Sequence, residues 1–202
     1  MSLAPNTSWR SALSMAAAAL LLASVTGCGA SDAPDASAPS AETSSSEARP
    51  PEAPKAPAPT RLAVPSLGID STLLRLGLNE DGTVEVPPAE QGMTAGWYAG
   101  GAVPGEPGPA VLIGHNDTRF GKAVFHDLHR IAKGADIAVS GGGGKKAHFT
   151  VTGTETVRKN AFPTAKVYGA TDERVLRLIT CDGGYDAAGH PVDNLIVYAT
   201  LR

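Results

Sequence analysis

Two side chains capable of joint chemistry each follow an apolar, strand-like run. Cys181 follows the run 175–180, and His115 follows the run 110–114. Runs rich in Val, Leu and Ile favour buried strands, and the loops at strand ends commonly carry catalytic residues. A thiol is nucleophilic as the thiolate, and a neighbouring imidazole can take or return its proton. The pattern therefore predicts nucleophilic thiol catalysis, provided that the two strands are neighbours in one sheet.

Spacing alone leaves a second interpretation open, in which Cys181 is a buried structural thiol and His115 a structural histidine. An internal disulfide is disfavoured, because the chain has two cysteines and the other, Cys28, lies near the N-terminus in a different context. Cys181 is therefore treated as a free or reactive thiol.

The sequence gives no reason to expect a metal or a cofactor. His126 and His129 flank Asp127 and could ligate a metal, but we favour a solvated helix face. The carboxylates of the stretch 80–85 could hold calcium, but a plain turn explains them. No glycine-rich phosphate loop follows a strand and opens a helix.

Short strands separated by turns dominate the chain after residue 60. Because they recur at close spacing with little helical periodicity, we expect an all-β fold, either a closed barrel or a sandwich. One brief stretch, 122–131, has helical spacing. The first expected strand contains Pro65 and should therefore lie at an edge or a bulge. The expected strands are 61–69, 71–78, 83–86, 95–98, 110–114, 135–139, 147–158, 175–181 and 195–201.

Residues 1–28 are expected to be a signal peptide with a lipobox. Arg10 gives a positive start, and 12–25 is an apolar run that is short for a membrane span. The run leads into Val25-Thr26-Gly27-Cys28, which is similar to the bacterial lipobox, whose cysteine receives a diacylglyceryl group and becomes the mature N-terminus. An ordinary secretory signal and an uncleaved anchor are the alternatives. All three send the following domain across the membrane.

Residues 29–60 form a predicted linker, which contains no Ile, Leu, Val, Met or aromatic residue. Such a segment cannot bury enough apolar surface to offset its ordering entropy, and its prolines favour extended geometry. The folded domain is expected at 61–202. A net charge of −3 over 202 residues gives no basic footprint, so nucleic acid is not an expected partner.

The motifs around both reactive residues resemble those of sortases. Leu178-Ile179-Thr180-Cys181 looks like the Leu-x-Thr-Cys strand that carries the sortase nucleophile, and Gly114-His115-Asn116-Asp117 is similar to the segment with the catalytic histidine. The stretch 61–70 resembles the first sortase strand. Gly96-Trp97-Tyr98 and the glycines after Cys181 are most similar to the actinobacterial class F, with class E next.

This resemblance implies an eight-stranded β-barrel with one or two short helices. It implies a cysteine transpeptidase that cuts a C-terminal sorting motif such as Leu-Pro-x-Thr-Gly after Thr and forms an acyl-thioester on Cys181. An amine from a cell-wall precursor or a pilin would resolve that intermediate. Together with a lipid on Cys28, it implies an enzyme anchored to the outer face of the cell membrane.

One residue departs from the family pattern. Sortases carry an arginine at the start of the last strand, and counting back from Tyr198-Ala199-Thr200 puts Asn194 there. Asn194 can donate a hydrogen bond to an oxyanion, so it is the expected third site residue. Arg177 lies about 13 Å from Cys181 along an extended strand, too far to act directly. Arg119 could reach in from another segment, or activity could be weak.

Two other functions follow from this departure and from the exported Cys/His pair. A non-catalytic surface lipoprotein could keep a sortase-like barrel as a peptide-binding module. A cell-wall L,D-transpeptidase also uses an exported cysteine and histidine, but it requires a cysteine just after a His-Gly pair and an arginine two residues on. That pattern is absent from the sequence.

Overall fold

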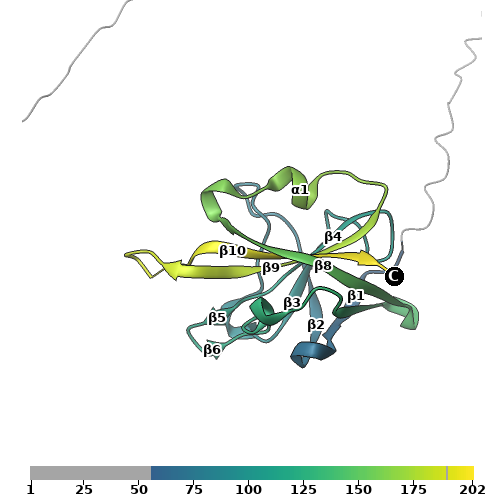
Figure 1. Cartoon of the computed structure of the whole chain (residues 1–202), viewed down its shortest axis with the longest axis horizontal. Helices are drawn as coiled ribbons and strands as arrows, with labels where there is room; N and C mark the ends of the chain where they lie inside the picture. Colours follow the sequence, from purple (N-terminus) through teal and green to yellow (C-terminus); the bar gives the residue numbers. More distant parts are fainter. Residues whose placement is uncertain (1–55, 190) are drawn as a thin grey trace, which may run out of the picture. The chain divides into compact units, whose positions relative to one another are not determined.

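A computed structural model describes residues 56–189 and 191–202 (Figure 1). The predicted signal segment 1–28 with Cys28, most of the predicted linker, and His190 lie outside the described residues. No helix within the described ranges is long and apolar enough to cross a membrane.

A closed barrel of eight strands forms the centre of the described chain (Figure 1), with the order β1-β2-β3-β4-β9-β10-β8-β7. Its strands are β1 (Pro59–Val64), β2 (Ile69–Leu76), β3 (Ala95–Tyr98), β4 (Gly108–Ile113), β7 (Asp136–Gly141), β8 (Lys146–Arg158), β9 (Arg174–Tyr185) and β10 (Pro191–Leu201). β5 (Asp117–Thr118) and β6 (Gly121–Lys122) form a separate two-stranded sheet. The predicted eight-stranded all-β barrel is confirmed.

Helical structure in the described residues is limited to one short α-helix, α1 (Thr164–Tyr168), and single 3-10 turns. The turns are η1 (Pro65–Leu67), η2 (Ala89–Gln91), η3 (Leu128–Arg130), η4 (Gly142–Gly144) and η5 (Lys159–Ala161). The helical spacing of 122–131 is misleading, because the segment contains only η3. Its apolar side chains, among them Phe125 and Leu128, reach the core from irregular backbone instead.

The predicted first strand, 61–69, is two separate elements. β1 ends at Val64 and Pro65 opens η1, because proline has no N–H to give to a strand ladder. Gly68 has a φ of 65°, in the left-handed region that glycine adopts readily. The chain therefore reverses, and β2 pairs antiparallel with β1, with Ile69 opposite Val64.

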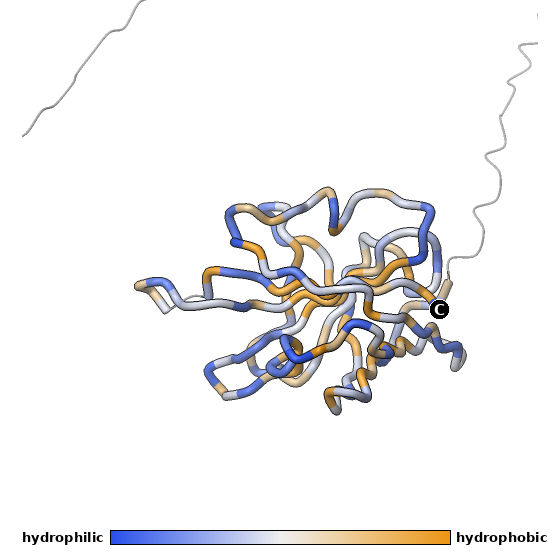
Figure 2. The backbone as a smooth tube through the Cα atoms, in the orientation of Figure 1, coloured by the Kyte–Doolittle hydropathy of each residue, from blue (hydrophilic) through white to orange (hydrophobic). Residues whose placement is uncertain are grey.

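Apolar layers lie on both faces of the sheet around β4, β9 and β10. The interior cluster includes the fully buried Phe125, Phe149, Leu176 and Leu178. On the outer face, Val111, Ile179 and Ile196 pack with Val167 of α1. Figure 2 shows apolar colours concentrated along the central strands and more polar colours in much of the surrounding loop structure. The outer layer gives α1 a surface to cover, and the candidate site lies beside it.

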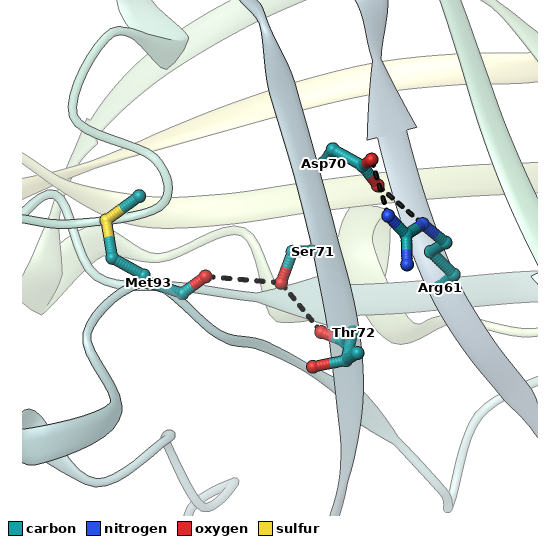
Figure 3. A network of polar contacts seen from close by, with 5 residues as sticks. All are labelled: Arg61, Asp70, Ser71, Thr72 and Met93. Carbon is teal, nitrogen blue, oxygen red and sulfur yellow. Dashed lines mark hydrogen bonds and ion pairs between the residues drawn. The ribbon is translucent and has the colours of Figure 1, made fainter.

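A buried serine joins β2 to the start of β3 (Figure 3). Ser71 Oγ accepts the backbone N–H of Ala95 at 3.0 Å and donates to the carbonyl oxygen of Thr72 at 2.7 Å. Figure 3 also shows the exposed ion pair of Arg61 with Asp70, at 2.6 and 2.5 Å, which joins β1 to β2. The hydrogen bond from Arg61 lowers the pKa of the Asp70 carboxyl.

Candidate active site

The strand that ends before His115 and the strand that contains Cys181 are direct neighbours. β9 continues to Tyr185, so the expected strand 175–181 extends past the cysteine. β4 pairs with β9 in parallel, with Ile113 opposite Ile179. His115 and Cys181 each lie two residues beyond this pair, so both emerge at the same end of the barrel. The neighbour relation that the Cys/His hypothesis requires is therefore present.

Asn194 lies directly opposite Cys181 on the antiparallel neighbour β10. Opposed residues of an antiparallel pair point to the same face of the sheet, and both side chains are partly buried. Asn194, Cys181 and His115 line one groove of about 760 Å³ on the outer face. Cys181 is a free thiol.

The groove has an apolar rim and an aromatic wall. Leu78 and Val86, from the loop after β2, line it and are 53% and 57% exposed. Tyr98 and Tyr168 meet edge to face with ring centroids 5.9 Å apart, and Phe162 lies 6.1 Å from Tyr168. Burial raises the pKa of the Tyr168 hydroxyl. The lining therefore suits an extended chain with apolar side chains.

A backbone carbonyl orients the histidine. Nε2 of His115 lies 2.6 Å from the carbonyl oxygen of Pro87. A carbonyl oxygen only accepts, so Nε2 carries a hydrogen and donates it. Nδ1 is therefore the ring atom left to exchange a proton with a substrate or with Cys181.

The loop that carries Pro87 is held by its own short contacts. Leu78 and Val84 form an isolated antiparallel bridge where a full strand 83–86 was predicted. The Glu85 carboxylate accepts the backbone N–H of Gly77 at 2.6 Å. Glu85 therefore helps to fix the loop that carries the Pro87 carbonyl.

The residue before the histidine must be small. A Cβ built on Gly114 would lie 2.6 Å from a ring carbon of Phe125 and 2.7 Å from a methyl of Val124. Both neighbours are buried in the core. Only glycine therefore lets the chain leave β4 closely enough to the core to bring His115 to the groove.

Arg177 does not lie in the groove with Cys181. Its guanidinium carbon is 4.7 Å from the ring centroid of Tyr198, and it lines a different hollow. Burial lowers the pKa of Arg177. Arg177 therefore lies outside the groove that holds Cys181 and Asn194, in agreement with the expectation that it is too far from the thiol to act directly.

Arg119 lines a second cavity, which shares His115 and Cys181 with the groove but does not include Asn194. It pairs with Glu90 and stacks 4.8 Å from the ring centroid of Phe120. The cavity has a volume of about 380 Å³. Arg119 therefore lines the cavity next to Cys181 but not the groove in which Asn194 lies.

The histidines that were considered as metal ligands have other partners. Nδ1 of His126 lies 2.9 Å from a carboxylate oxygen of Asp117, and Nδ1 of His129 lies 3.2 Å from the backbone carbonyl of His126. Within residues 56–189 and 191–202, no group of three or more His, Cys, Asp or Glu side chains is arranged to hold a metal ion.

A polar cluster behind the groove fastens α1 to β8 and β10. Lys166 Nζ lies 2.5 Å from Glu155 Oε2, to which the Tyr198 hydroxyl also donates at 2.8 Å. These two hydrogen bonds, the one from Lys166 first, lower the pKa of Glu155. Burial and then the bond to Glu155 raise the pKa of Tyr198. The cluster fixes the helix that carries Tyr168 into the groove wall.

Two contributors to the groove were missed from the sequence. The sequence predicts only a loop around Pro163, yet Phe162 and Tyr168 on either side of it form the aromatic wall. The sequence feature that could have indicated this wall is the pair of aromatic residues, Phe162 and Tyr168, close to Pro163. The sequence could not have revealed the Pro87 contact, because His115 bonds to a backbone carbonyl oxygen and every residue type has one.

The sequence-family model for the sortase domain matches residues 62–202. A comparison with curated proteins finds no match.

Several solved sortases are similar in fold. Sortase C-1 from Actinomyces oris is 21% identical with a TM-score of 0.56, over 71% of this chain and 73% of that one. Sortase A from Corynebacterium diphtheriae is 19% identical with a TM-score of 0.56, over 73% and 62%. Sortase C2 of Group B Streptococcus Pilus Island 1 is 21% identical with a TM-score of 0.54, over 71% and 73%. The match of the family model over 62–202 shows that this chain belongs to the sortase family of cysteine transpeptidases.

Proposed function

We propose that this sortase cleaves a C-terminal sorting motif of the Leu-Pro-x-Thr-Gly type through an acyl-thioester on Cys181 and transfers the acyl group to an amine. The register of three neighbouring strands carries the proposal, since β4, β9 and β10 bring His115, Cys181 and Asn194 to one groove. An extended peptide fits such a groove. The apolar rim and aromatic wall suit the leucine and proline of the motif.

The proposed reaction has two halves. The Cys181 thiolate attacks the threonine carbonyl carbon, the carbon–nitrogen bond breaks, and protonated His115 gives a proton through Nδ1 to the leaving amine. The acceptor amine then attacks the thioester carbonyl and loses a proton to His115. The carbon–sulfur bond breaks, and the thiolate returns. The acceptor is an amine from a cell-wall precursor or a pilin.

Asn194 is the proposed oxyanion donor. Each tetrahedral intermediate places a negative charge on the former carbonyl oxygen, next to the sulfur. The backbones of Asn194 and Cys181 are one strand spacing apart, so the Asn194 amide is a donor within reach of an oxyanion beside the sulfur. A neutral donor gives a weaker hydrogen bond than arginine, because charge-assisted bonds are about twice as strong.

Further proposals concern the whole chain. We assign residues 1–28 to a signal with a lipobox, residues 29–60 to a stalk, and residues 61–202 to the catalytic domain. A lipid on Cys28 then holds the enzyme on the outer face of the cell membrane. Gly96-Trp97-Tyr98 and the glycines after Cys181 support a class F assignment, with class E next.

The alternative is a non-catalytic lipoprotein that binds sorting peptides in the same groove. The observation in its favour is that no arginine from the described residues lines the groove beside Cys181. Acylation of the thiol separates the two functions, because a binding module forms no covalent product.

The test incubates the purified full-length chain with a library of sorting-motif peptides and detects a covalent adduct by mass spectrometry. We expect an acyl adduct on the peptide that contains Cys181 and release of the C-terminal fragment. Cys181→Ala removes only a thiol from a partly buried position within β9, so it should abolish both products and keep the fold. Cys28→Ser removes the other thiol and should keep both. Cleavage by Cys181→Ala at the wild-type rate would refute the mechanism.

A further inference from the structure

One lysine lies in the groove that holds Cys181. Among the described residues that line this groove, Lys159 is the one lysine or arginine, and no aspartate or glutamate is present. The other lining groups are apolar, aromatic, glycine or neutral polar side chains, together with His115. The fixed charge within this groove is therefore a single positive one, whereas the adjoining cavity at Cys181 is lined by Asp117, Arg119 and Asp182.

Lys159 lies at the thiol end of the groove. It is the first residue of η5, directly after β8 ends at Arg158. Val157, two residues earlier, pairs with Asn194, which pairs with Cys181. Two strand spacings place the Val157 backbone about 10 Å from that of Cys181. The flexible four-carbon stem of lysine can then bring its ammonium to a peptide beside the thiol.

Lys159 has no polar partner among the residues that the structure describes, whereas the neighbouring cations do. Arg158 lies 3.4 Å from Asp193, and Lys166 lies 2.5 Å from Glu155. Among residues 56–189 and 191–202, no hydrogen bond or ion pair involves the exposed Lys159 side chain. Its charge is therefore available to a ligand in the groove.

We propose that Lys159 is a specificity-determining residue that binds an acidic side chain of the sorting peptide, close to the cleaved bond. This inference rests on the proposed function, since it assumes that the groove receives the peptide. Water around an exposed ammonium and added salt both weaken its effect on any charge that it does not contact directly. A carboxylate on the peptide can approach much more closely, next to apolar walls that exclude part of the water.

The test compares peptides that carry Glu, Gln or Lys at each position of the motif in turn. With the wild-type full-length chain, we expect cleavage of the Glu peptide at one position to exceed that of the Gln peptide about five-fold, the effect of an ion pair worth about 1 kcal/mol. Lys159→Gln should bring this ratio close to one. Lys159→Glu should invert it in favour of the Lys peptide. Added salt should reduce the wild-type ratio.

Lys145 provides the matched control, because it is an exposed lysine at the opposite end of β8 and lines a different hollow. Lys145→Gln should keep the full Glu preference. A wild-type chain with no Glu preference at any position, or a preference that survives in Lys159→Gln, would overturn the proposal.

A binding measurement separates failure of this inference from failure of the proposed function. Cys181→Ala cannot be acylated, so the affinities of labelled Glu and Gln peptides for it can be measured by fluorescence anisotropy. A preference for Glu that disappears in Cys181→Ala/Lys159→Gln supports the role of Lys159 even if the wild type cleaves nothing. Equal affinities in Cys181→Ala would overturn that role even if the wild type cleaves every peptide.

Discussion

Asn194 occupies the position at which the resemblance to sortases leads us to expect an arginine. Its strand register places it directly opposite Cys181, so its location is what an oxyanion donor requires. A neutral amide cannot stabilise a thiolate by charge. If Asn194 is the oxyanion donor that we propose, it acts through the geometry of its hydrogen bond.

The first prediction concerns this amide. Asn194→Ala should lower the rate of Cys181 acylation by on the order of 100-fold, because it removes one oxyanion donor. Peptide affinity should change little, since the bond forms mainly in the transition state. Single-turnover acylation, followed by mass spectrometry at several peptide concentrations, measures both quantities.

Asn160 supplies a control for that variant, because it is exposed, lies in η5 and does not line the groove. Asn160→Ala should acylate like the wild type. Unchanged kinetics in Asn194→Ala would count against the assignment. So would a larger loss in Arg119→Ala, which would make the cavity on the other side of Cys181 the source of the donor.

The identities of the candidate residues were accessible from the sequence, but their orientation was not. Cys181 and His115 each follow a strand, and Asn194 follows from counting back along the last strand. The hydrogen bond from His115 Nε2 to the Pro87 carbonyl depends on a loop conformation. No side-chain pattern encodes that contact, so the choice of Nδ1 as the proton-exchanging atom required the structure.

At the scale of elements, the parallel pair β4–β9 positions the site, and the link between β2 and β3 supports one wall of it. β2 and β3 pair in parallel over four residue pairs, from Leu73 opposite Ala95 to Leu76 opposite Tyr98. Ser71 extends this link, because its hydroxyl accepts the N–H of Ala95. The link matters for the groove because Tyr98, at the end of β3, lies in the aromatic wall.

The second prediction concerns this serine. Ser71→Ala should reduce the free energy of unfolding by about 1–3 kcal/mol, because the buried Ala95 N–H loses its acceptor. Chemical denaturation of the full-length chain measures the change. Thr72→Ala is the control, since it removes an exposed hydroxyl from the next residue of β2 and should have a smaller effect. Equal losses in both variants would contradict this role of Ser71.

Strand positions were largely predictable, and the errors have physical causes. The apolar runs of β4 and β9 are buried on both faces, which gives a strong signal. The stretch 122–131 has helical spacing, but its apolar residues reach the core through irregular backbone with only one 3-10 turn. α1 was missed because five residues are too few for a helical pattern. It owes its position to packing of Val167 on the outer layer.

At the scale of the whole chain, one prediction concerns its attachment. Cys28→Ser should release or mislocalise the protein, or leave its signal uncleaved, because the proposed lipid has no other attachment site. Cell fractionation gives the location, and mass analysis of the mature N-terminus gives the modification. An unmodified mature wild-type protein that starts at another residue would rule out lipidation at Cys28.

The closed barrel leaves no unpaired edge among its eight strands, and β1 is the strand that closes it. β1 pairs with β2 on one side and with β7 on the other. Its Leu62 and Val64 are fully buried in the interior cluster. Removal of β1 would therefore expose two strand edges and delete two core side chains, each worth about 1.5–3 kcal/mol of burial.

The last prediction tests this closure by truncation. A chain that starts at residue 56 keeps β1 whole, because the strand begins at Pro59, and it should unfold at the same temperature as the full-length protein. A chain that starts at residue 65 lacks β1 and should be unfolded or aggregated, since the edges of β2 and β7 have no partner. Circular dichroism and size-exclusion chromatography distinguish these states. A folded, monomeric chain that starts at 65 would contradict this prediction. It would mean that the fold does not need β1 and that the long ladders of β8, β9 and β10 supply most of its stability.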